Sequence, residues 1–127
     1  MKKVLTLLFL LTMFFAGKQA VGAMTYEEAM SQTKPFVLLV YAPWADNVDT
    51  VMQSFNNMQQ KYSSTYNFVA MNIATEDAKS FNKKYHIYPN LPYILLYKDK
   101  GKISRYLQQN CILDDSCFAE KLDFFSN

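Results

Sequence analysis

The feature that most constrains the fold of this chain is a continuous apolar stretch at residues 36–42, FVLLVYA. A run without a charged or amide side chain cannot alternate between a core face and a solvent face. Its enrichment in Val and Leu favours a strand that is buried on both faces of a sheet. Such a strand needs apolar helices on both sides, so the stretch predicts a layered α/β domain with this strand near its centre.

The segments on either side of the strand have the patterns of helices. We expect a first helix over residues 26–32, with Thr25 as its N-cap and Glu28 as the capping-box partner. A second helix is expected to follow Asp46 as its cap and to extend to Tyr62. Its apolar positions keep helical spacing: Val48, Val51, Met52, Phe55, Met58 or Gln59, and Tyr62.

The remainder of the chain predicts further strands and helices. We expect a strand at residues 67–74, a helix at 76–85 and a hairpin within 93–107 that turns at 99–101. A last helix is expected to begin near Asp114. The inward positions of the two helices are Ala78, Phe81 and Tyr85 in the first, and Phe118, Leu122 and Phe125 in the second. This order, α-β-α-β-α-β-β-α, predicts a central mixed four-stranded sheet flanked by helices.

The N-terminus resembles a secretory signal peptide. Lys2 and Lys3 precede an apolar run at residues 4–16, and small residues lead up to Ala23, after which we expect cleavage. An uncleaved membrane anchor is the alternative, but a bilayer requires about 20 apolar residues and this run is shorter. We therefore expect residues 1–23 to be a signal peptide and residues 24–127 to form one domain in a secreted or periplasmic protein.

The charge of the expected mature chain excludes two classes of partner. Three of the 13 basic residues precede residue 24, so 10 basic and 11 acidic residues remain, a balance of −1. Without a basic stripe, we expect neither a nucleic-acid partner nor membrane binding after cleavage. We also expect no cofactor and no metal.

Two separate motifs carry a resemblance to a known family. Tyr41, Ala42, Pro43 and Trp44 end the central strand, and Pro92 precedes the next strand in the sequence LPY. In these motifs, and in element order over essentially the whole of residues 24–127, the chain resembles the thioredoxin family. The resemblance implies a thioredoxin-like fold, and it implies that the bond before Pro92 is cis.

The chain departs from the family pattern at the positions that carry its chemistry. Ala45 and Val48 stand where the family has the two cysteines of its Cys-x-x-Cys motif, and Leu39 replaces a buried acid that many members carry. Thiol exchange requires a thiolate to attack a disulfide sulfur, which neither an Ala nor a Val side chain can do. Pro89 is an additional proline in a loop that is longer than is usual in the family.

The resemblance also implies a surface that could hold an extended peptide. Trp44, Tyr88, Pro92 and Tyr93 would converge around the groove in which relatives bind their substrates, and backbone beside a cis-proline can pair with a strand. Ordinary packing of a tyrosine-rich protein is the alternative for these aromatic residues.

Other polar residues near these motifs have simpler interpretations. Asp46 and Asp49 are expected to satisfy the amide groups at the helix N-terminus rather than to act as paired catalytic carboxylates. His86, the single histidine, is expected to be solvated or a hydrogen-bonding residue rather than a proton carrier.

Cys111 and Cys117 are the only cysteines of the chain. An even pair in an oxidising compartment predicts a disulfide. The alternative is a relocated redox centre, because Cys117 would lie in the first turn of the last helix, where a thiol pKa can be lowered. Asp114 and Asp115 disfavour a thiolate there.

Three functions therefore remain open after reading the sequence. The first is a secreted or periplasmic module that binds a polypeptide or protein partner without the usual redox site. The second is a thiol-disulfide oxidoreductase that uses Cys111 and Cys117. The third is a purely structural protein of the envelope, and the oligomeric state is left open for all three.

Overall fold

The computed structural model describes residues 24–76, 78–79, 81 and 90–127. The expected signal peptide therefore lies outside the described residues. The elements follow the order α2 (Tyr26–Met30), β1 (Phe36–Tyr41), α3 (Val48–Tyr62), β2 (Asn67–Asn72), β3 (Tyr93–Lys98), β4 (Ile103–Leu107), α5 (Gln109–Ile112) and α6 (Asp115–Ser126).

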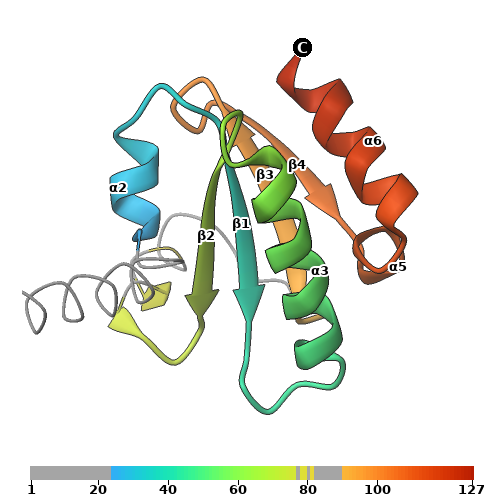
Figure 1. Cartoon of the computed structure of the whole chain (residues 1–127). Helices are drawn as coiled ribbons and strands as arrows, with labels where there is room; N and C mark the ends of the chain where they lie inside the picture. The colour runs from blue at the N-terminus through green and yellow to red at the C-terminus, as the bar shows by residue number, and fades with distance from the viewer. Residues whose placement is uncertain (1–23, 77, 80, 82–89) are drawn as a thin grey trace, which may run out of the picture.

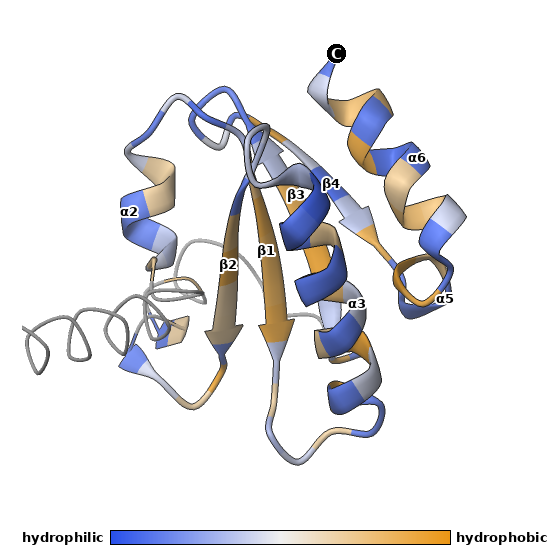
Figure 2. Cartoon of the chain, viewed as in Figure 1, coloured by the Kyte–Doolittle hydropathy of each residue, from blue (hydrophilic) through white to orange (hydrophobic). Residues whose placement is uncertain are grey.

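The strands form one mixed sheet in the order β2-β1-β3-β4 (Figure 1). Strand β1 pairs with β2 in parallel and with β3 antiparallel, and β3 pairs with β4 as an antiparallel hairpin. All residues of β1 except the last are buried, so the prediction of a central strand covered on both faces is confirmed. Figure 2 shows how this buried strand differs from the outer strand β4: β1 is coloured as hydrophobic, whereas β4 carries hydrophilic residues.

Alternation along the strands divides the core into two layers. Val37, Leu39, Ile94 and Leu96 face α3 and α6, where they pack with residues such as Phe55, Phe118 and Leu122. The intervening strand residues pack on the other face with Tyr26 and Ala29 of α2 and with Ala78 and Phe81. Successive side chains of a strand point to opposite faces of the sheet, so consecutive apolar residues of a strand pack alternately in the two layers.

Thr25 caps α2 as expected, and the expected start of the last helix near Asp114 is confirmed. The Thr25 hydroxyl oxygen accepts a hydrogen bond from the Glu28 amide at 3.1 Å. At α6 the Asp114 carboxylate accepts from the amides of Ser116 and Cys117, and the last helix thus begins where the sequence indicates. Both side chains satisfy amides that have no partner within the helix.

Two elements end earlier than expected, and each has a local cause. Helix α2 ends at Met30 rather than at residue 32, and the Ser31 hydroxyl donates to the Glu28 carbonyl at 2.7 Å at that end. Strand β2 ends at Asn72 rather than at residue 74, because the Asn72 side-chain oxygen accepts from the Ala74 amide at 2.9 Å and turns the chain.

The helix expected at residues 76–85 is described only in part. Glu76, Ala78, Lys79 and Phe81 are helical, and Ala78 and Phe81 are buried as expected. Tyr85 lies outside the described residues. The hairpin turn at residues 99–101 is confirmed, with positive φ at Asp99, Lys100 and Gly101.

Candidate functional site

The loop that follows β1 presents a tryptophan to solvent. The Ala45 amide donates to the Ala42 carbonyl at 3.0 Å, which closes a turn around Pro43 and Trp44. The Trp44 side chain is 72% exposed. A large aromatic residue with this exposure contributes little to the core, so its ring is accessible to a binding partner.

Helix α3 begins differently from the sequence expectation, which placed Asp46 at its cap. The N-cap is Asn47, with φ 65° in the left-handed region, and no side chain forms a cap hydrogen bond there. Asparagine tolerates this conformation better than most residues that have a Cβ atom. The expectation that Asp46 caps this helix is therefore wrong, because the chain turns through Asn47 before the helix begins.

A glutamine side chain joins this loop to the segment before β3. The Asn47 amide nitrogen Nδ2 donates to Gln109 Oε1 at 3.3 Å. The Gln109 nitrogen Nε2 in turn donates to the Leu91 carbonyl at 3.1 Å. One residue of α5 thus ties together two segments that are far apart in the sequence.

The bond between Leu91 and Pro92 is cis, as expected. Pro92 is buried, and Tyr93 is fully buried with its ring packed against Tyr106 at 5.3 Å between centroids. Of the four residues expected to form a peptide surface, Trp44 is therefore exposed, whereas Pro92 and Tyr93 belong to the interior. Tyr88, like His86, lies outside the described residues.

A polar pocket of about 290 Å³ lies beside this bridge. Its lining consists of amide side chains and one partly exposed aromatic residue: Asn90, Gln108, Gln109, Asn110 and Tyr106. None of these residues is charged. Side-chain amides donate and accept hydrogen bonds at once, as peptide groups do, so the pocket is suited to neutral polar groups.

Sequence reasoning did not identify Gln109 or Asn90 as site residues. No spacing or motif distinguishes them from other amide residues of the chain. Their role depends on the short helix α5, which sequence reasoning did not identify and which brings Gln109 against Leu91.

Ala45 and Val48 are the residues that the resemblance places at the positions of the redox cysteines. Ala45 precedes α3 and Val48 is its first residue, and both are partly buried. Val48 thus lies in the first turn of α3, and Ala45 lies in the loop before it. Neither side chain can form a thiolate, so this helix terminus has no nucleophile for thiol exchange.

Comparison with solved structures identifies the fold of the chain. No family model matches the chain, and no curated protein matches it. Mitochondrial thioredoxin 3 of Saccharomyces cerevisiae, in its oxidised form, matches with a TM-score of 0.58 at 16% identity, over 75% of this chain and 82% of its own. The germline-specific thioredoxin Deadhead of Drosophila melanogaster matches with a TM-score of 0.57 at 15% identity, over 74% and 83%. A malarial protein matches with a TM-score of 0.58 at 15% identity, over 72% and 96%.

The chain has a thioredoxin-like fold. At these identities the similarity establishes the fold and not the activity, so the chemistry must be argued from the residues of this chain.

The disulfide of this thioredoxin-like fold joins α5 to α6 and involves no residue of α3. Cys111 of α5 and Cys117 of α6 are bonded, which confirms the predicted pairing. The Asp114 carboxylate accepts from the Cys117 amide at 3.2 Å. The cysteine of α6 therefore lies in the first turn of its helix, beside the carboxylate that caps this helix.

The residues that the structure describes show neither a metal-binding cluster nor a membrane-spanning helix. It contains no group of three or more His, Cys, Asp or Glu side chains placed to hold a metal ion. Over the same residues, no helix has both the length and the apolar character needed to cross a bilayer.

Proposed function

We propose that this chain is a secreted or periplasmic thioredoxin-fold protein that binds polypeptide and does not catalyse thiol exchange. The observation that carries the proposal is the Gln109 bridge, which fixes the loop of the exposed Trp44 beside a pocket lined by amides. An exposed aromatic ring supplies apolar contact, and the amides match the hydrogen-bonding groups of a peptide backbone.

The bridge also defines how a peptide would contact this surface. The Leu91 carbonyl already accepts a hydrogen bond from Gln109, which fills one of its two acceptor positions. A peptide on this surface would therefore be held by the amides of the pocket and by the Trp44 ring as well as by backbone. Its recognition would depend little on charge, because the pocket residues are neutral.

The proposal also states that the protein is exported from the cytoplasm. The residues before position 24 have the pattern of a signal peptide, and the disulfide between Cys111 and Cys117 suits an oxidising environment. Protein recovered from outside the cytoplasm should begin at Met24 by mass spectrometry. Recovery of a chain that retains residues 1–23 would contradict the cleavage.

Binding can be tested with reduced, carboxymethylated α-lactalbumin as an unfolded polypeptide. Trp44 is the single tryptophan of the chain, so its fluorescence reports on this surface when the added polypeptide contains no tryptophan. The fluorescence titration should therefore use a tryptophan-free peptide derived from α-lactalbumin. We expect a saturable change in emission. Trp44→Ala should weaken binding about tenfold, measured by anisotropy of the labelled peptide.

A matched pair of amide substitutions tests the bridge itself. Gln109→Ala removes both hydrogen bonds and should weaken binding, whereas Gln53→Ala changes an exposed glutamine of α3 and should leave it unchanged. Equal affinity of the wild type, Trp44→Ala and Gln109→Ala would refute a polypeptide site at this surface.

A further inference from the structure

Strand β4 is an exposed edge of the sheet. It pairs with β3 on one side and is the last strand in the sheet order of the described residues. Four of its five residues are exposed, and Leu107 alone is buried. An edge strand carries backbone N–H and C=O groups that can pair with another extended segment.

A groove separates this edge from α6. It has a volume of about 130 Å³, and its apolar lining consists of Leu96 and Leu107 from the sheet and Phe124 and Phe125 from the helix. The Phe124 ring is 75% exposed. For comparison, an apolar cavity of about 150 Å³ can hold a benzene ring, so the groove can accept one apolar side chain.

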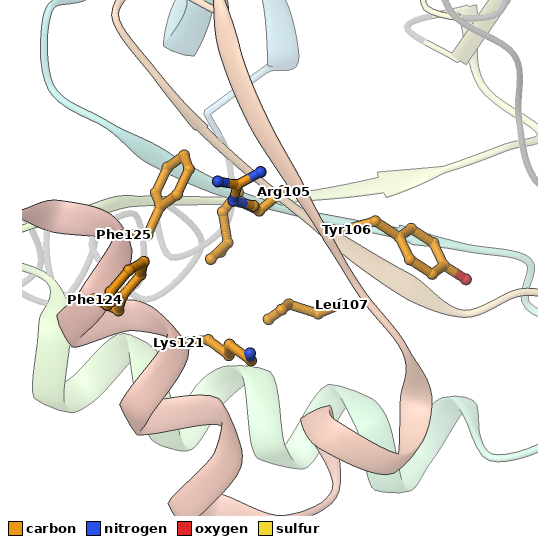
Figure 3. A pocket seen from close by; sticks show the side chains of 7 residues that line it. Arg105, Tyr106, Leu107, Lys121, Phe124 and Phe125 are labelled. Carbon is orange, nitrogen blue, oxygen red and sulfur yellow. The ribbon is translucent and has the colours of Figure 1, made fainter.

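The charged residues of the groove are all basic. Arg105 on β4 and Lys121 on α6 line it, as Figure 3 shows, and Tyr106 points away from them. Within the described ranges, neither Arg105 nor Lys121 has a carboxylate at ion-pair distance, since the single ion pair found there joins Lys79 and Glu76. A third basic residue, Lys98 of β3, donates a hydrogen bond to the Phe125 carbonyl at 2.8 Å, near the C-terminal end of α6.

The face of β4 that meets the groove follows from its register. Arg105 lies opposite Leu96 and Leu107 lies opposite Ile94, and these partners belong to the core layer beneath α6. A strand added outside β4 would direct every second side chain to the same face. An apolar residue there could enter the groove, and acidic residues two positions away on either side would approach Arg105 and Lys121.

We propose that the β4 edge and this groove bind an extended acidic peptide segment that places one aromatic or aliphatic side chain between β4 and α6. Charge complementarity selects the acidic segment, because the groove presents two basic side chains and no acidic one. Backbone pairing with β4 supplies affinity, and the groove supplies specificity. Tyr106 of β4 lines both this groove and the polar pocket, but neither Trp44 nor Gln109 lines the groove, and this proposal does not depend on the function proposed above.

The probe is a labelled seven-residue peptide, Thr-Glu-Thr-Phe-Thr-Glu-Thr, which places Glu, Phe and Glu on one face of a strand. We expect it to bind the purified protein in an anisotropy titration. The same peptide with Lys in place of both Glu residues should bind at least about tenfold more weakly, and so should the peptide with Ser in place of Phe.

Variants of the protein locate the site. Arg105→Glu and Phe124→Ser change exposed side chains, so both proteins should fold, and each should weaken binding of the acidic peptide about tenfold or more. Lys61→Glu, a charge reversal at an exposed position of α3, is the matched control and should bind as the wild type does. Trp44→Ala should also leave this binding unchanged, which separates the two surfaces.

Three outcomes would overturn the proposal. Acidic and basic peptides could bind equally, or binding could be insensitive to both Arg105→Glu and Phe124→Ser. Alternatively, the groove could have another occupant. Binding of anionic phosphatidylserine vesicles that Arg105→Glu abolishes, without binding of the peptide, would assign the surface to a membrane. A dimer in gel filtration that Phe124→Ser dissociates, again without peptide binding, would assign it to a second copy of the chain.

Discussion

Tyr66 shows how one buried residue fixes a helix that lies far away in the sequence. Its hydroxyl donates to the Leu122 carbonyl at 2.6 Å, and its side chain is almost fully buried. Burial is the main cause that raises the pKa of Tyr66 to about 12. The protonated phenol is therefore the form that the folded state stabilises.

Tyr66 should make stability depend on alkaline pH. Burial raises its pKa from the ordinary tyrosine value of 10.0 to about 12 in the folded chain. The contribution of Tyr66 is fully present below pH 10 and is lost as pH rises through 12, because the unfolded chain releases its proton first. Tyr66→Phe should lower the free energy of unfolding by about 1 kcal/mol at neutral pH and should flatten this dependence.

Urea unfolding at several pH values between 8 and about 12 measures both effects. Tyr106→Phe, which changes a partly exposed tyrosine, is the control for general titration of tyrosines. The assignment fails if wild type and Tyr66→Phe lose stability in parallel above pH 10.

At the scale of elements, the disulfide fixes α5 to α6. Helix α5 has four residues, too few for independent stability, and it carries Gln109 of the candidate site. The bond between Cys111 and Cys117 therefore holds a short element on which the bridge to Leu91 depends.

Replacing both cysteines with serine should destabilise the protein without changing its fold. The closed loop is short, so we expect a loss of about 2 kcal/mol from loop entropy and a lower melting temperature. Thermal unfolding followed by circular dichroism measures it, and Ser116→Ala at an exposed position between the cysteines is the control. Equal melting temperatures for the wild type and the double variant would contradict a structural role of the bond.

At the scale of the whole molecule, the protein has a thioredoxin-like scaffold without sulfur at the start of α3. We expect the purified protein not to accelerate the reduction of insulin by dithiothreitol above background. The reason is that Ala45 and Val48 cannot form the mixed disulfide through which exchange proceeds.

A turbidity assay of insulin precipitation tests this expectation, with the Ala45→Cys, Val48→Cys double variant as a comparison. Catalysis by the wild type would direct attention to Cys111 and Cys117. Its loss in Cys117→Ser would then support the relocated redox centre and contradict a function by binding alone.

The sequence by itself determined the features that depend on neighbouring residues. Apolar runs predicted the strands, Thr25 and Asp114 predicted two helix starts, and residues 99–101 predicted the turn of the hairpin. These features were predictable because backbone preference, side-chain caps and periodicity act within a few residues.

Tertiary structure alone decided the start of α3, the burial of Tyr93 and the bridge through Gln109. Asn47 takes the cap position while its amide bonds to Gln109, a residue that lies 62 positions away. Tyr93 continues an apolar strand, and whether its ring faces solvent or Tyr106 depends on how β4 pairs beside it. The groove between β4 and α6 has the same origin, because its walls belong to elements that meet only when the chain has folded. These contacts join segments that are far apart in the sequence, so no local sequence pattern predicts them. Their physical cause is the packing of the complete sheet against its helices.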